Sequence, residues 1–177
     1  FERLLEIRKK ADAILVGRGT LETDQMTMNV EDRTPWRCVI SESGKLDPAH
    51  PLFHSEGGPR HLIVGDDAEV PDLPATIHRT KLAGFLEELR HTPEVNTLLC
   101  EGGGSLVKEL FELDVVDEIN LTWAPHTLFG GHKAPTLTGL PGDFLPASRH
   151  YNLVEMIKHR EDEVFLTYHK SSLGSGR

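Results

Sequence analysis

Apolar and polar positions along the first two thirds of the chain follow two alternating patterns. The first is a short, mostly apolar run, which is typical of a buried strand. This pattern predicts strands at residues 13–17, 37–41, 61–65, 75–78 and 97–100. The second pattern repeats apolar side chains every third or fourth position, which predicts helices over residues 1–10, 82–90 and 104–113.

The last third of the chain has a different pattern. Alternation over residues 116–125 predicts a strand, and residues 151–158 and 163–169 predict an antiparallel hairpin around a turn at His159–Asp162. Strands that alternate with helices as far as residue 113 imply parallel βαβ units. We therefore expect an α/β fold: a mixed, mostly parallel sheet with helices on both faces, joined by the C-terminal antiparallel hairpin.

The length of 177 residues predicts one domain, which we place at residues 1–170. Residues 171–177 are polar and glycine-rich, which predicts a disordered tail. The polar residues 18–25 predict a loop or a single helical turn. Because the chain opens within a helical pattern and without Met, we expect further residues to precede this sequence.

Charge and hydropathy narrow the classes of function. The chain has 19 Lys and Arg against 28 Asp and Glu, a net charge of −9, which gives no basic footprint for a nucleic-acid backbone. No apolar run approaches the roughly 18 residues of a membrane span, and no secretory signal is evident, so we expect a cytoplasmic protein. Cys38 and Cys100 lie in strand-like runs, which favours buried thiols over a disulfide framework.

A carboxylate and three glycines stand where a strand meets a helix. Glu101 follows the strand at 97–100, and Gly102, Gly103 and Gly104 lead to Ser105 and the next helix. Glycine lets a phosphate approach the backbone, and a helix N-terminus offers unpaired N–H groups. These features favour a phosphate or nucleotide site, and a tight turn with close helix–strand packing is the alternative.

A second glycine-rich segment, "VGRGTLETD", has the same logic. Gly17 and Gly19 follow a strand, and Thr20 and Asp24 are four residues apart, so both can face one ligand. The alternative is a helix N-cap by Thr20 with Asp24 in solvent. Two glycine-rich strand ends and two acids in one small domain favour a single shared site, with Asp24 and Glu101 as candidates for orienting substrate or relaying a proton.

The stretch "ISESGKL" offers hydroxyls and a cation at a third strand end. Ser41, Ser43 and Lys45 could hold the extra phosphate of NADP, but the segment slightly favours a hairpin turn. His50 and His54 have helical spacing, but Pro48 and Pro51 argue against a helix there. No Cys or Glu completes a zinc ligand set, so we predict no metal site. No hydrolase motif is present either, which favours a cofactor that carries the chemistry.

The segments "ADAILVGRGTLETDQM", "RCVISESGKLDP" and "LLCEGGGSLVKELFELDVVDEINLTWAPHTLFGG" resemble the C-terminal reductase domain of bacterial riboflavin biosynthesis enzymes, which has a dihydrofolate reductase-like fold. The resemblance implies an NADPH-dependent oxidoreductase like 5-amino-6-(5-phosphoribosylamino)uracil reductase, acting on a small pyrimidine- or pterin-like substrate. By resemblance, the NADP contacts are Thr20, Asp24, Gly103, Gly104, Ser105 and Leu106. By resemblance, the substrate contacts are Arg8, Met28 and Glu101.

The resemblance also implies a homodimer in the cytoplasm. Where the family has an Arg for the substrate phosphate, this chain has Glu31, and Arg33 lies nearby. A glutamate there repels a phosphate, so we expect the phosphorylated precursor to be a poor substrate. Two further readings stay open: a non-catalytic nucleotide-binding or assembly module, and a dihydrofolate reductase proper.

Overall fold

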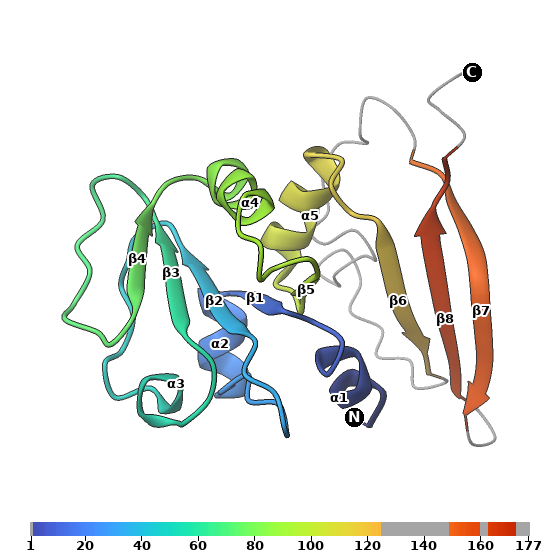
Figure 1. Ribbon diagram of the computed structural model, residues 1–177, viewed down its shortest axis with the longest axis horizontal. Helices are drawn as coiled ribbons and strands as arrows, with labels where there is room; N and C mark the ends of the chain where they lie inside the picture. Colours follow the sequence, from blue (N-terminus) through green and yellow to red (C-terminus); the bar gives the residue numbers. More distant parts are fainter. Residues whose placement is uncertain (1, 125–148, 160–162, 173–177) are drawn as a thin grey trace, which may run out of the picture. The chain divides into compact units, whose positions relative to one another are not determined.

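A computed structural model describes residues 2–124, 149–159 and 163–172 of the chain (Figure 1). The chain divides into two compact units, Phe1–Leu106 and Val107–Arg177, and each is described by itself. The expectation of one domain stays a prediction, and most of the expected tail, residues 173–177, lies outside the described residues. Among the described residues, no helix is both long and apolar enough to span a membrane.

The first unit is built on a parallel sheet of five strands in the order β4-β3-β2-β1-β5. Its elements are α1 (Glu2–Arg8), β1 (Ala13–Gly17), α2 (Arg18–Asp24), β2 (Trp36–Ser41), α3 (Pro51–His54), β3 (Arg60–Val64), β4 (Thr76–Arg79), α4 (Leu82–Arg90) and β5 (Leu98–Cys100). The five predicted strands and their parallel pairing are confirmed.

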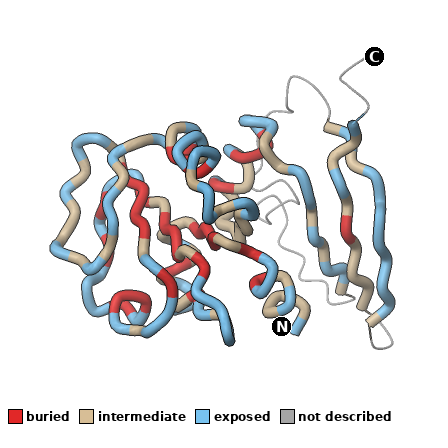
Figure 2. Tube along the Cα trace, in the orientation of Figure 1, coloured by how far each residue is buried: buried red, intermediate tan, exposed pale blue. Residues whose placement is uncertain are grey.

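The core of this unit follows from the alternation of side chains along the strands. Ile14 of β1 and Leu62 of β3 belong to one buried apolar cluster that also includes Leu21 of α2 and Leu52 of α3. The opposite face carries His78 of β4, whose ring contacts Phe85 of α4. Helices therefore cover both faces of the sheet, as predicted, and burial concentrates along its strands (Figure 2).

Two short helices differ from the sequence-based expectation. The polar segment 18–25 contains α2, a helix of seven residues, where a loop or single turn was expected. α3 forms although Pro51 argued against a helix, because Pro51 is in the first turn, where the missing N–H has no intrahelical partner. His50 caps this helix: its Nδ1 accepts from the Leu52 N–H, and its Nε2 lies 3.1 Å from the Leu21 carbonyl oxygen.

The second unit contains an antiparallel sheet of three strands, β6 (Glu118–Trp123), β7 (Tyr151–His159) and β8 (Glu163–Lys170), in the order β6-β8-β7. α5 (Gly104–Glu112) precedes it and begins at the end of the first unit. The hairpin of β7 and β8 is confirmed, with Tyr151 opposite Lys170. Residues 160–162 of its turn lie outside the described residues.

One detail of the expected fold is wrong. The hairpin was expected to join the parallel sheet, but β6 takes the second edge of β8, so these strands form a sheet of their own among the described residues. Lys170 at the end of β8 is tied to Asp114 after α5, with its Nζ donating to the Asp114 carbonyl oxygen over 2.7 Å.

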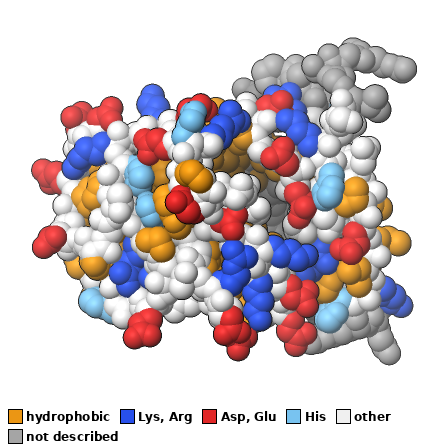
Figure 3. Space-filling view, in the orientation of Figure 1, with side chains coloured by type: hydrophobic (Ala, Val, Ile, Leu, Met, Phe, Trp, Pro, Cys, Tyr) orange, Lys and Arg blue, Asp and Glu red, His pale blue; other side chains and the backbone are white. Residues whose placement is uncertain are grey.

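Acidic and basic side chains are interspersed over the face of the molecule seen in Figure 3.

Candidate functional site

The two glycine-rich segments meet at the carboxyl ends of β1 and β5. Leu15 of β1 is paired with Cys100 of β5, and the chain reaches β5 only after crossing back from β4 at the far edge of the sheet. The Gly17 N–H donates to the Gly102 carbonyl oxygen over 3.1 Å. Such a switch in strand order is where open α/β sheets bind ligands. The two glycine-rich segments therefore lie side by side, and a single ligand site shared by them stays a prediction.

The backbone after β5 needs glycine. Gly102 has φ +100° and Gly103 has φ +57°, values that side chains disfavour. A Cβ at Gly103 would also lie 3.2 Å from Thr20 Oγ1. Thr20 of α2 therefore packs against Gly103. Because Gly103 has no side chain, its backbone is not shielded by one of its own.

α5 begins at Gly104, so the first N–H groups of this nine-residue helix have no carbonyl partner within it. Ser105 is exposed, whereas the Leu106 side chain is buried in the core. For Leu106, only the backbone N–H is available to a ligand. The glycines and this helix N-terminus together form an anion-accepting backbone segment.

Arg8 and Glu101 are brought together as a buried ion pair. Arg8 Nε donates to Glu101 Oε1 and Nη2 donates to Oε2, each over 2.5 Å. The side chains are 10% and 4% exposed. The two residues expected to contact substrate separately thus engage each other in the two-pronged geometry that guanidinium and carboxylate groups favour.

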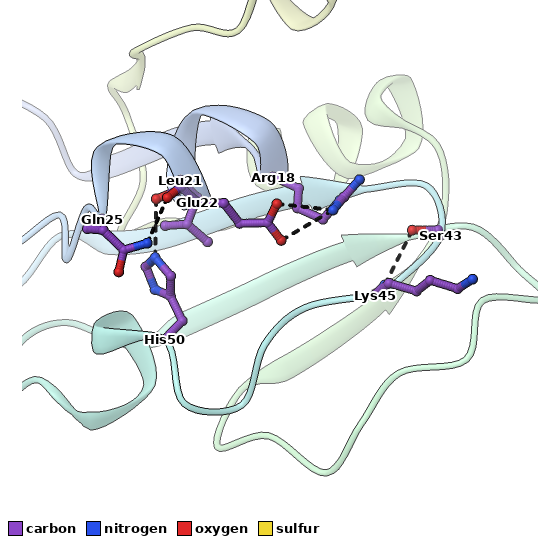
Figure 4. A network of polar contacts seen from close by, with 7 residues as sticks. All are labelled: Arg18, Leu21, Glu22, Gln25, Ser43, Lys45 and His50. Carbon is purple, nitrogen blue, oxygen red and sulfur yellow. Dashed lines mark hydrogen bonds and ion pairs between the residues drawn. The ribbon is translucent and has the colours of Figure 1, made fainter.

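The third strand end holds a buried hydroxyl. Ser41 is 5% exposed, and among the described residues its Oγ has no hydrogen-bond partner. The chain then turns through Gly44, whose N–H donates to the Ser41 carbonyl oxygen and whose φ is +68°. Ser43 is exposed, and its Oγ accepts from the Lys45 N–H over 3.4 Å (Figure 4). The slightly favoured interpretation of a hairpin turn is wrong, because β2 and β3 run parallel.

Arg18 is a residue of this region that the sequence analysis did not single out. It is the first residue of α2 and directly follows Gly17, whose neighbour in the sheet is Ile40. Its guanidinium forms hydrogen bonds of 3.1 and 3.2 Å to the Glu22 carboxylate, at the same end of the strands as Ser43 and Lys45 (Figure 4). The sequence signal that could have identified Arg18 is a cation directly after a strand that ends in glycine.

Two predicted site residues lie elsewhere in the first unit. Asp24 is exposed at the last position of α2, about 6 Å along the helix axis from Thr20. Met28 is 1% exposed, has φ +55° and belongs to the apolar core cluster. The catalytic role of Asp24 and the substrate contact of Met28 stay predictions.

The two thiols are unsuited to nucleophilic chemistry. Cys38 is buried, Cys100 is half-buried, and both are free. Burial raises the pKa of Cys38 to about 12. Burial also raises the pKa of Cys100; the Gly102 N–H opposes this with a smaller effect, and the charge of Glu101 adds the smallest rise. The expectation of unpaired thiols is confirmed, and the expectation of burial is confirmed for Cys38 but not for the half-buried Cys100.

Comparison with known proteins identifies the family. Residues 2–160 match the RibD C-terminal domain family. The chain belongs to this family. The RibD C-terminal domain chain is 26% identical over 155 residues to the 2,5-diamino-6-ribosylamino-4(3H)-pyrimidinone 5′-phosphate reductase of Archaeoglobus fulgidus, covering 74% of this chain and 69% of that protein. It is 28% identical over 156 residues to the reductase of the same name from Aquifex aeolicus, covering 80% and 69%.

Solved structures agree on the fold. Acinetobacter baumannii RibD superposes with a TM-score of 0.77 at 18% identity, covering 96% of this RibD C-terminal domain chain and 49% of that one. A pyrimidine reductase-like protein of Corynebacterium diphtheriae gives 0.68 at 17% identity, covering 95% and 79%. The chain thus spans about half the length of the solved RibD chain, and the predicted α/β fold of this family is confirmed.

Proposed function

We propose that this RibD C-terminal domain is an NADPH-dependent reductase of a small pyrimidine-like substrate in riboflavin biosynthesis. The observation that carries the proposal is the hydrogen bond that joins Gly17 to Gly102 at the point where the strand order reverses. Because of this bond, the glycine-rich segments after β1 and after β5 lie next to each other, and α5 begins directly after the second of them. The curated relatives are themselves named as pyrimidinone phosphate reductases.

The residues present fit a dinucleotide phosphate. A diphosphate would be held by the N–H groups from Gly103 to Leu106, with Thr20 beside them, because Gly103 presents no Cβ. The buried Ser41 hydroxyl, which has no partner among the described residues, fits a ligand group. Arg18 and Lys45 would supply positive charge for the additional phosphate that distinguishes NADPH from NADH.

The chemistry divides between cofactor and protein. NADPH, when bound, supplies a hydride. Reduction of a polarised C=N bond adds that hydride to carbon and requires a proton at nitrogen. In the described structure both Glu101 oxygens accept from Arg8, so this carboxylate orients its neighbours. Asp24 is exposed and stays the candidate for relaying the proton.

The region around Glu31 bears on the substrate. Glu31 is 78% exposed and pairs with Lys9 over 3.2 Å. Arg33 donates to the Asp12 carboxylate over 3.0 Å. Lys9 thus offsets part of the Glu31 charge. Arg8 and Arg33, the other cations that could attract a substrate phosphate here, are engaged by Glu101 and Asp12, which supports a substrate that is neutral or carries its charge elsewhere.

Binding and turnover together test the proposal. Isothermal calorimetry should show NADPH binding to the purified protein, and NADPH oxidation should follow when pyrimidine substrates are added. NADPH binding without turnover across pyrimidines and pterins would favour the non-catalytic module. Turnover of dihydrofolate alone would favour a dihydrofolate reductase. A homodimer and a cytoplasmic location remain part of the proposal.

A further inference from the structure

The Arg8–Glu101 ion pair lies directly before the glycine segment, and its position suggests a role that differs from substrate binding. We propose that this pair is a clamp that holds the glycine segment, residues 101–104, in its ligand-binding shape. Arg8 and Glu101 are then positioning residues, and Glu101 is not the proton donor. The inference rests on the proposed function, because it takes this segment to be the NADPH site.

The glycine segment has few anchors of its own. Gly102 and Gly103 have positive φ values and no side chains to pack. Unrestrained glycines have wide conformational freedom, so a defined shape requires contacts at the ends of the segment. Two backbone bonds supply part of it: the Glu101 N–H donates to the Leu15 carbonyl oxygen over 3.0 Å, and the Gly102 carbonyl accepts from Gly17 over 3.1 Å.

The clamp supplies the side-chain anchor between these two backbone bonds. Both Glu101 oxygens are held by Arg8, which fixes the rotation of the side chain as well as its position. Arg8 is itself fixed at the end of α1, because its carbonyl accepts from the N–H of the buried Ala11. The glycine segment is thereby tied through α1 to the core of the first unit.

Burial makes the pair dependent on both partners. The Glu101 side chain is only 4% exposed, so removing Arg8 leaves a carboxylate with little access to water. The same burial argues against direct chemistry. A proton donor must aim an O–H at the reacting atom, whereas both oxygens here face guanidinium N–H groups.

The experiment compares Arg8→Gln, Glu101→Gln and the double variant with wild type. The matched control is Lys9→Gln, which removes the neighbouring cation of an exposed pair with Glu31. Two quantities are measured: NADPH affinity by calorimetry, and exchange of the Gly17 amide hydrogen by NMR, which needs no cofactor. Circular dichroism confirms that each variant is folded. Arg8→Lys serves as a milder variant if Arg8→Gln does not fold.

The clamp predicts that each single variant weakens NADPH binding by about tenfold or more and accelerates exchange at Gly17. The double variant should bind NADPH no more weakly than the single variant with the lower affinity, because both substitutions remove the same contact. The control should match wild type, and kcat at saturating NADPH should fall by less than about threefold in Glu101→Gln.

A result that contradicts the clamp can be told apart from one that contradicts the proposed function. Loss of kcat in Glu101→Gln with unchanged NADPH affinity and unchanged Gly17 exchange would make Glu101 catalytic and overturn the clamp. If wild type itself does not bind NADPH, the proposed function fails, and exchange at Gly17 alone then decides the clamp. Unchanged exchange in both single variants overturns it, whatever the cofactor result.

Discussion

The backbone N–H of Gly17 donates to the carbonyl oxygen of Gly102 over 3.1 Å, which joins two glycine-rich segments from distant parts of the sequence. This bond closes the gap between the carboxyl ends of β1 and β5. It sets the spacing between Thr20 on one side and Gly103 on the other. The predictions for the site depend on that spacing.

Gly103→Val should weaken NADPH binding by about 1–3 kcal/mol. The new Cβ would lie 3.2 Å from Thr20 Oγ1 and would be held at φ +57°, where a branched side chain is strained. Calorimetric titration with NADPH measures the loss. Gly19→Ala is the matched control, because a Cβ at Gly19 has no neighbour within 4 Å. Equal affinities for wild type and Gly103→Val would show that the diphosphate is held elsewhere.

Arg18→Gln should reduce the preference for NADPH over NADH by about tenfold, which corresponds to ~1.4 kcal/mol. The guanidinium lies at the same end of the strands as Ser43 and Lys45 and would contact the additional phosphate, which NADH lacks (Figure 4). The ratio of the two dissociation constants is the measurement. Arg90→Gln, an exposed arginine that pairs with Glu87, should leave the ratio unchanged. A ratio equal to that of wild type in Arg18→Gln would remove Arg18 from the cofactor site.

Glu31→Arg should improve turnover of the phosphorylated riboflavin precursor. The substitution exchanges a negative for a positive charge, and each unit charge 4 Å from a phosphate is worth roughly 1 kcal/mol in water. Steady-state kinetics with that precursor give the comparison. A wild-type specificity constant of about 10⁴ per molar per second or above would contradict the expectation that Glu31 disfavours this substrate.

Protonation of His61 should make the protein less stable in acid. Its ring stacks on Trp36 and its Nδ1 lies 2.9 Å from His78 Nε2, while His78 Nδ1 lies 2.8 Å from Glu88. Burial, followed by the charge of His78, lowers the pKa of His61 from 6.5 to about 4. Between these values the unfolded chain binds more protons at His61, so this contribution to stability is complete above pH 6.5 and declines toward pH 4.

The loss should not exceed about 3 kcal/mol. Denaturant unfolding of wild type and His61→Gln between pH 7 and pH 4 measures it, and the variant should show the shallower decline. His91→Gln, which changes an exposed histidine of the same unit, should follow wild type. Parallel curves for wild type and His61→Gln would be the contrary result.

Arg37→Lys should destabilise the first unit by about 2–4 kcal/mol. The buried guanidinium donates through Nε to Gly58 and through Nη1 to Asn29 Oδ1 and Ser55 Oγ, which joins two loops to β2. A lysine cannot reproduce this fork of donors. Urea unfolding gives the free energy, and a change below about 0.5 kcal/mol would mean that these contacts are replaced by water.

The sequence predicted the central strands of the parallel sheet well because β1, β2 and β3 are largely buried. Segments 13–17 and 61–65 are mostly apolar runs that end in Gly and are too short for a typical helix. α2 was missed because Leu21 is its single buried side chain, so the segment carries no periodicity. α3 was missed because Pro51 breaks a helix interior but is compatible with the first turn.

The site was predictable as far as strand topology reaches. Parallel strands place their carboxyl ends at one edge of the sheet, so the sequence predicted the Gly17 and Gly102 segments at the same edge, whereas the position of β5 next to β1 came from the structure. The pairing of Arg8 with Glu101 could not, because it depends on where α1 ends relative to β5. The burial of Ser41 and Met28 is likewise a tertiary property, since both stand in segments that also contain exposed residues.

If Ser41 contacts the ligand as proposed, its buried hydroxyl links folding to binding. Its Oγ has no partner among the described residues, and a buried hydroxyl without one destabilises a fold by about 1–3 kcal/mol, a cost that a ligand bonded to it would relieve. An alanine at this position would then favour the empty protein and disfavour the loaded one. Selection for heat resistance alone would therefore tend to replace this serine, whereas selection for catalysis would keep it. The residue at position 41 thus indicates which of the two selection pressures has acted.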